Sequence, residues 1–236
     1  MRYENVVKGK FIGRPNRFIA LVEVDGQEVR AHVKNTGRLK ELFVPGVEVY
    51  LEDHVGRMGD RKLRYSLIGV CKGNEKVNVD SQAPNKVVKE ALETGKLFPA
   101  GIKSVSYIKP EYKFGDSRLD FYVESEEGEK VLMEVKGVTL EVDGVARFPD
   151  APTERGVKHV EELIKATEEG YKACVVFVIK MKGVNRFCPN YDTHPEFGEA
   201  LARAKAAGVE VIAVDCLVKK DSLAIDSQIN VSLKNA

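Results

Sequence analysis

A carboxylate and an ammonium group lie two positions apart in one short apolar stretch, residues 131–137. Apolar residues alternate along this stretch, and a period of two is typical of a buried strand. Successive side chains of a strand point to opposite faces, so Glu134 and Lys136 share one face. An ordinary ion pair would explain this arrangement. The alternative is a hydrolytic site, in which the carboxylate holds Mg²⁺ or Mn²⁺ and the lysine orients a water or steadies a phosphate.

Asp120 supplies a second carboxylate from a neighbouring strand candidate, residues 117–123. The apolar residues of this stretch also alternate, and Asp120 falls on the opposite face. A polar segment, residues 124–129, separates the two strand candidates and has the composition of a hairpin turn. We therefore expect the two strands to pair in an antiparallel hairpin.

The length of the hairpin loop decides whether the two carboxylates meet. A loop of three residues, 126–128, places Asp120 opposite Glu134, whereas a loop of two residues places it opposite Val135 and on the wrong face. Two carboxylates side by side repel each other at neutral pH unless a cation lies between them. The proposed chemistry therefore predicts the three-residue loop.

Two helix candidates would bring further polar groups to this sheet. Residues 85–95 have the apolar spacing of a short helix, and Glu90 lies at the edge of its apolar stripe. Glu90 is either a solvated side chain or a third acid that reaches toward the sheet. A longer helix starts near residue 153, and a helix N-terminus with added cations is a suitable phosphate site. Arg155 and Lys158 in its first turns are therefore candidate contacts to DNA phosphates, although a solvated helix start is as common.

The composition is that of an ordinary folded protein. The chain has 236 residues, of which 43% are hydrophobic and 31% charged, and this length allows one large domain or two small ones. The sequence contains neither an apolar run of membrane-spanning length nor a signal-peptide pattern, so we expect a cytoplasmic protein without membrane contact. The four cysteines form no Cys-x-x-Cys pair, which argues against disulfides and a zinc cluster.

The N-terminal third differs from the rest of the chain in structure and in charge. Short alternating runs separated by turns predict about five strands, which favours a small barrel of OB type, a fold that often binds nucleic acids or sugars. Residues 1–80 carry 15 Lys and Arg against 11 Asp and Glu, whereas residues 81–236 carry 22 against 25. This excess favours an anionic partner such as DNA, with a merely solvated basic surface as the alternative. The cations expected to contact DNA here are Arg14, Arg17, Lys34 and Arg38.

Beyond residue 83, helix and strand patterns alternate along the chain. Their order, one helix, three strands, then helix, strand, helix and strand, predicts an α/β domain with a mixed sheet flanked by helices.

Six ordered segments carry a family resemblance. They are Asn16-Arg17-Phe18, Asn35-Thr36-Gly37-Arg38-Leu39, Pro84-Asn85, Ser117-Arg118-Leu119-Asp120-Phe121, Glu134-Val135-Lys136-Gly137-Val138-Thr139-Leu140 and Phe148-Pro149-Asp150-Ala151-Pro152-Thr153-Glu154-Arg155-Gly156. Through them the chain resembles the sugar fermentation stimulation protein family over nearly its whole length. The resemblance implies an OB-fold-like DNA-binding domain, residues 1–82, and a restriction-endonuclease-like domain similar to PD-(D/E)xK nucleases, residues 83–236. It also implies non-specific DNA binding and a regulatory link to maltose metabolism.

The same resemblance assigns roles to individual residues. The nuclease pattern places an acidic metal ligand at Asp120, a second carboxylate at Glu134, the lysine at Lys136 and a first-helix glutamate at Glu90. The backbone carbonyl of Val135 is a further candidate ligand of the metal.

Three functions therefore remain open. The first is a DNA-binding nuclease that depends on Mg²⁺ or Mn²⁺. The second is a non-catalytic DNA-binding regulator whose nuclease-like domain is only a scaffold, and the third is an OB-type module that binds sugars. The sequence leaves the oligomeric state undecided, with a homodimer as one option.

Overall fold

The computed structural model describes residues 1–35 and 37–234; Thr36, which belongs to one of the motifs quoted above, lies outside them, as do residues 235 and 236. The chain forms two compact units. Unit 1 comprises Met1–Ala83, Lys180–Gly183 and Cys216–Ala224, and unit 2 comprises Pro84–Ile179, Val184–Asp215 and Ile225–Ala236. Within the described ranges, every helix is too short or too polar to cross a membrane.

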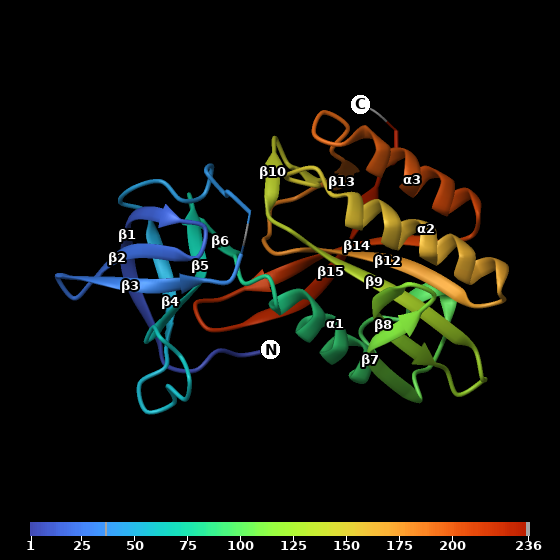
Figure 1. The fold of residues 1–236 in the computed structure, drawn as a ribbon, viewed down its shortest axis with the longest axis horizontal. Helices are drawn as coiled ribbons and strands as arrows, with labels where there is room; N and C mark the ends of the chain where they lie inside the picture. Colours follow the sequence, from blue (N-terminus) through green and yellow to red (C-terminus); the bar gives the residue numbers. More distant parts are fainter. Residues whose placement is uncertain (36, 235–236) are drawn as a thin grey trace. The chain divides into compact units, whose positions relative to one another are not determined.

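Unit 1 is a closed β-barrel (Figure 1). Its strands are β1 (Val6–Asn16), β2 (Ile19–Val24), β3 (Gln27–Val33), β4 (Glu48–Asp53), β5 (Tyr65–Lys72) and β6 (Glu75–Asn78). They follow the order β3-β2-β1-β4-β5-β6, and a parallel pairing of β3 with β5 closes the barrel. Between β2 and β3, Asp25 and Gly26 both have positive φ, as a tight two-residue hairpin turn requires. The predicted OB-type barrel is confirmed.

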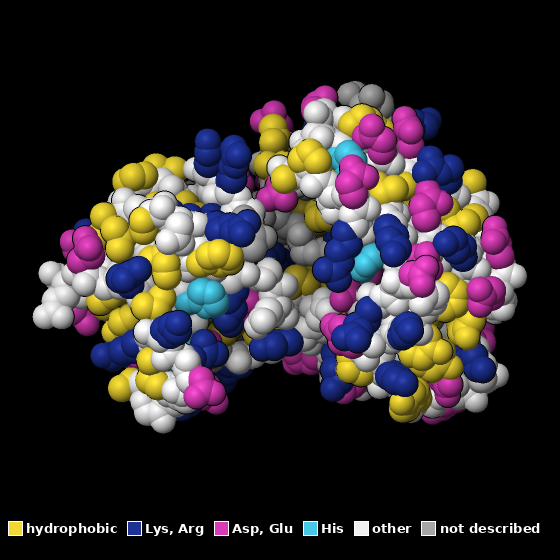
Figure 2. Space-filling model, in the orientation of Figure 1, with side chains coloured by type: hydrophobic (Ala, Val, Ile, Leu, Met, Phe, Trp, Pro, Cys, Tyr) yellow, Lys and Arg dark blue, Asp and Glu magenta, His cyan; other side chains and the backbone are white. Residues whose placement is uncertain are grey.

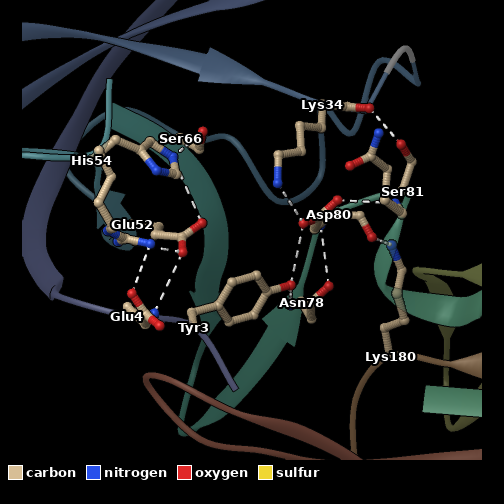
Figure 3. Close-up of polar contacts among 12 residues, drawn as sticks. Tyr3, Glu4, Lys34, Glu52, His54, Ser66, Asn78, Asp80, Ser81 and Lys180 are labelled. Atoms are coloured by element: carbon tan, nitrogen blue, oxygen red, sulfur yellow. Dashed lines mark hydrogen bonds and ion pairs between the residues drawn. The ribbon is translucent and has the colours of Figure 1, made fainter. Parts of the chain in front are cut away.

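A buried polar network ties distant segments of the chain into unit 1 (Figure 3). The Asp80 side chain is fully buried and forms an ion pair of 2.9 Å with Nζ of Lys34. The hydroxyl of Tyr3 donates to Asp80 at 3.3 Å, and Nδ2 of Asn78 donates to that hydroxyl at 2.9 Å. Nζ of Lys180 donates to the Asp80 carbonyl at 3.1 Å. Because buried charges are tolerated only with partners, this network fixes the segment at Lys180 to the barrel.

Unit 2 is built on a mixed sheet (Figure 1). Its strands are β7 (Tyr107–Phe114), β8 (Ser117–Glu124), β9 (Lys130–Val138), β10 (Leu140–Val142), β11 (Val145–Phe148), β12 (Lys172–Ile179), β13 (Arg186–Pro189), β14 (Glu210–Val218) and β15 (Leu223–Val231). The order is β10-β11-β13-β15-β14-β12-β9-β8-β7. The hairpin strands β7, β8 and β9 pair antiparallel, whereas β12 pairs parallel with β9 and β14.

Helices flank this sheet, which confirms the predicted fold class. They are α1 (Ala83–Glu93), α2 (Glu154–Glu168), α3 (Pro195–Ala206) and a short 3₁₀ turn, η1 (Pro99–Gly101). Helix α2 buries Val160, Leu163 and Ala166 at helical spacing and packs against α3, β12 and β9. Its first turn is capped by Thr153, whose hydroxyl accepts the N–H of Gly156 at 3.1 Å.

Gly156 is required by the packing around this cap. A Cβ atom at that position would lie 2.8 Å from the Thr153 side chain and 3.2 Å from the ring of Phe197. The Thr-Glu-Arg-Gly segment of the sequence therefore fixes how α2 begins.

Candidate functional site

The hairpin of β8 and β9 has the register that the proposed chemistry requires. The N–H of Ser125 donates to the carbonyl of Glu129 at 2.9 Å, so residues 126–128 form a three-residue loop. Glu124 pairs with Lys130, and the ladder continues to Phe121 and Met133. One position further along this register, Asp120 lies opposite Glu134. The predicted loop length and register are confirmed.

Asp120 is held by two hydrogen bonds from unit 2. Its Oδ1 accepts Nδ2 of Asn85, in the first turns of α1, at 2.7 Å, and its Oδ2 accepts the N–H of Val135 at 2.7 Å. Burial, and then the charge of Glu134, raise the pKa of Asp120 to about 6. An acid with this pKa pays an energetic cost for its charge at neutral pH, which a cation would remove.

Glu134 lies deeper in the sheet, with only 3% of the residue exposed. Its Oε1 accepts Nζ of Lys136 at 2.5 Å and Nδ1 of His159 at 2.5 Å. Burial opposes ionisation of Glu134, but the hydrogen bond from His159 and the charge of Lys136 outweigh it, so its pKa lies below the ordinary value. Its other oxygen, Oε2, is buried and lacks a hydrogen-bond partner among the described residues. A buried carboxylate oxygen in this condition can accept a cation.

His159 connects this pair to the start of α2. Because an ionised carboxylate only accepts hydrogen bonds, the proton toward Glu134 must sit on Nδ1 of His159. Its Nε2 accepts Nε of Arg155 at 3.4 Å. Arg155 and Lys158 are both exposed, and Figure 2 shows several Lys and Arg side chains over α2. The helix start therefore presents cations to solvent, and the His159 side chain links Arg155 to Glu134.

The acid pair fits a hard divalent cation better than a soft one. In the part of the chain that the structure describes, three or more His, Cys, Asp or Glu side chains nowhere form a ready metal-binding group. Mg²⁺ does not need such a cage, because it is usually held by one or two carboxylates, waters and substrate phosphates. Asp120 with its raised pKa and the unpartnered Oε2 of Glu134 supply such a pair.

The Glu90 carboxylate and the Val135 carbonyl are the two remaining groups predicted to take part in this site. Glu90 is exposed on α1, and it is Asn85 of the same helix that contacts Asp120. Five residues correspond to a rotation of roughly 140° around a helix, so Asn85 and Glu90 occupy different faces of α1. Val135 gives its N–H to Asp120. A role for the Glu90 carboxylate and for the Val135 carbonyl stays a prediction.

The four N-terminal cations divide into two kinds. The guanidinium of Arg14 donates to four backbone carbonyls within unit 1, and Lys34 is paired with buried Asp80. Arg17 and Arg38 are exposed. Arg14 and Lys34 are therefore engaged within unit 1, whereas Arg17 and Arg38 face solvent.

Sequence reasoning did not identify the contacts of Asn85 and His159 with the two acids. Asn85 belongs to one of the segments that carry the family resemblance, and this was the only signal that marked it. In the sequence, His159 is marked only by its place next to Lys158 at the basic helix start.

Comparisons with known proteins agree with this architecture. The family model for the "Sugar fermentation stimulation protein RE domain" matches residues 82–222, and the model for the "SfsA N-terminal OB domain" matches residues 12–79. A sugar fermentation stimulation protein homolog from Clostridium beijerinckii is 54% identical over 99% of this chain and 100% of its own. Another, from Desulfitobacterium hafniense, is 51% identical over 99% of each chain.

A solved structure gives the same result. It is described as "The structure of Pyrococcus Furiosus SfsA in complex with Ca2+", and its chain is 30% identical to this one, with a TM-score of 0.87 over 98% of each chain. The family models and the two homologs together span both units of the fold. This chain therefore belongs to the sugar fermentation stimulation protein family.

Proposed function

We propose that this protein binds DNA and that Asp120, Glu134 and Lys136 form a site that hydrolyses phosphodiester bonds with Mg²⁺ or Mn²⁺. The observation that carries the proposal is the pair of apposed carboxylates, one with a raised pKa and the other with a buried, unpartnered oxygen. In this reading residues 1–82 bind DNA, and residues 83–236 form the nuclease-like domain.

Asp120 and Glu134 would hold the cation. When bound, such a cation supplies Lewis acidity and lowers the pKa of water. Both effects lower the barrier to phosphodiester hydrolysis. Its further ligands would be waters, substrate phosphate oxygens and, as the sequence predicts, the carbonyl of Val135. The donor chemistry does not separate Mg²⁺ from Mn²⁺, so both belong in the test.

The protein's own groups orient this chemistry. Asn85 fixes the rotation of the Asp120 carboxylate, and His159 fixes that of Glu134. The ammonium of Lys136 lies on Oε1 of Glu134, and its side chain is 14% exposed, so it can reach a water or a phosphate oxygen at the edge of the site. Arg155 at the start of α2 would pair with a neighbouring phosphate of the strand.

The solved relative gives independent support for a cation. The Pyrococcus furiosus protein is described in complex with Ca²⁺, a hard divalent cation that prefers oxygen ligands. Asp120 and Glu134 offer oxygen ligands in this chain.

The test is cleavage of end-labelled DNA with Mg²⁺ or Mn²⁺, followed over time on a denaturing gel. Three variants probe the site: Asp120→Asn, Glu134→Gln and Lys136→Met. Glu168→Gln at the exposed end of α2 and Lys130→Met at the exposed first residue of β9 are matched controls that remove the same charges elsewhere. We expect cation-dependent cutting by the wild type and both controls, and its loss in the three site variants. Equal cutting by the wild type and Glu134→Gln would overturn the hydrolytic part.

A second candidate function is a non-catalytic DNA-binding regulator, for which the family resemblance suggests a link to maltose metabolism. The observation in its favour is that Oε1 of Glu134 already accepts hydrogen bonds from Lys136 and His159, and the Lys136 ammonium supplies counter-charge without a metal. This candidate predicts that Glu134→Gln binds DNA like the wild type and that neither protein cuts it.

A further inference from the structure

A pocket of about 430 Å³ opens on unit 1. Its described lining residues lie between Phe11 and Pro45 and do not include Asp120 or Glu134. Its volume lies within the roughly 300–1,000 Å³ that is usual for sites of small ligands. Its lining combines apolar and cationic residues, chiefly Phe11, Phe43, Pro45, Arg17, Arg38 and Lys40. None of the described residues that line it is acidic.

The pocket has a preformed wall. The two rings of Phe11 and Phe43 stack at a centroid distance of 5.2 Å and an interplanar angle of 17°. The guanidinium of Arg14 lies over the Phe43 ring at 5.2 Å. It also donates to the carbonyls of Arg17, Asn35, Gly37 and Arg38 at 2.6 to 2.9 Å. Arg14 therefore holds together the two chain segments that border the pocket.

The remaining cations of the rim are available to a ligand. Arg17, Arg38 and Lys40 are all exposed. The guanidinium of Arg17 lies 4.9 Å from the centre of the Phe18 ring, and Phe18 is 45% exposed. A cationic rim beside aromatic surface suits a ligand with a negative charge and a flat ring. A neutral sugar would gain little from these cations.

We propose that this pocket takes one unstacked nucleotide of a single-stranded DNA segment. The base would lie against Phe11, Phe43 and Pro45, and its phosphates would pair with Arg17, Arg38 and Lys40. The inference rests on the DNA binding proposed above and deepens it, because it names single-stranded rather than fully paired DNA as the preferred form. Bases in an intact duplex are stacked and cannot enter such a pocket.

Gly13 offers a way to fill the pocket. It lines the pocket, its φ lies outside the left-handed region, and a Cβ atom built there meets nothing within 4 Å. Gly13→Leu should therefore occupy the ligand space without straining the barrel. A second variant, Arg17→Ala with Arg38→Ala, removes rim charge instead. Arg30→Ala is the matched control, because Arg30 is exposed on β3 and does not line the pocket.

The assay is fluorescence anisotropy of the full-length protein with a labelled 15-nucleotide single strand and with a fully paired duplex of the same length. We expect Gly13→Leu and the double variant each to weaken single-strand binding by about ten-fold or more, and duplex binding by less than about two-fold. Arg30→Ala should bind both like the wild type. Circular dichroism and thermal melting check the fold of each variant, and the double variant decides if Gly13→Leu does not fold.

The outcomes separate the two proposals. Unchanged single-strand binding by both pocket variants, with DNA binding intact, would overturn the pocket alone. Loss of single-strand binding in both, without cleavage by the wild type, would support the pocket and overturn hydrolysis. Adenosine monophosphate that displaces the strand would support a nucleotide site, and displacement by maltotriose would overturn it in favour of a sugar site. A wild type that binds neither strand form would overturn both proposals.

Discussion

Replacing Asp120 by Asn should stabilise the protein at neutral pH, although it removes a proposed ligand. Burial and the charge of Glu134 raise the pKa of Asp120 from 3.8 to about 6. The difference between these two pKa values corresponds to ~3 kcal/mol by which the fold disfavours the ionised form. An Asn side chain is uncharged and has nearly the same shape. Its amide oxygen can accept the N–H of Val135, and its amino group can donate to the Asn85 side chain after that amide rotates.

The pH dependence follows from the direction of this shift. Between about pH 4 and pH 6 the folded protein holds a proton on Asp120 that the unfolded chain has lost. The wild type therefore loses stability relative to Asp120→Asn as the pH rises through this window. Below the window the two proteins should be nearly equal, and above it the variant should keep its full advantage, up to ~3 kcal/mol.

Urea unfolding at pH 4, 5, 6 and 7.5 in the presence of EDTA measures this difference, because other titrating groups affect both proteins alike. Asp116→Asn, on the exposed turn before β8, is the control and should differ from wild type by less than about 0.5 kcal/mol at each pH. The reasoning is refuted if Asp120→Asn is less stable than the wild type at pH 7.5. It is also refuted if the difference is the same at pH 4 and at pH 7.5.

Three further predictions test the rest of the account. Asp80→Ala should lower the free energy of unfolding by about 3–5 kcal/mol, because the nearly buried ammonium of Lys34 loses its counter-ion. A loss below about 1 kcal/mol in urea unfolding would show that this network does not stabilise the fold. Thr153→Ala should cost about 1 kcal/mol through the lost cap of α2, and Thr153→Ser should restore most of it in the same assay. Reversing the charges of Arg17 and Arg38 should reduce the magnitude of the negative slope of log affinity for single-stranded DNA against log salt by about 1.4, because each lost phosphate contact removes about 0.7; an unchanged slope would place the contact elsewhere.

The acid pair could be predicted from sequence because its geometry is local. Alternation of apolar residues identified both strands, and the need for Asp120 to face Glu134 selected the loop 126–128. The Asp25-Gly26 turn likewise marked the first hairpin of the barrel, since both residues adopt positive φ there. Local periodicity and turn chemistry are properties that a single segment carries by itself.

What escaped prediction depends on contacts between segments far apart in the chain. Asn85 and His159 reach the acids from two helices, and their own neighbours in sequence do not indicate this. Strands β10, β11 and β13 have only three or four residues, which is too short for a periodic signal. The sequence likewise did not show that the segment at Lys180 belongs to unit 1. In a sequence, a lysine that is buried and bonded to a carbonyl looks the same as a lysine on the surface.

Arg14 shows the same limit for binding residues. A sequence cannot distinguish an arginine that meets phosphate from one that holds its own backbone, because both occur in basic segments. Only the four carbonyl partners and the stacking on Phe43 reveal its structural role.

The proposed function requires that Asp120 and Glu134 together hold a divalent cation. Calorimetric titration of Mn²⁺ into the wild type, Asp120→Asn, Glu134→Gln and the control Glu168→Gln measures this binding. We expect saturable binding by the wild type and the control, weakened by more than about ten-fold in each of the two site variants. Binding by Glu134→Gln as tight as that of the wild type, or absence of binding by the wild type, would contradict the proposed cation site.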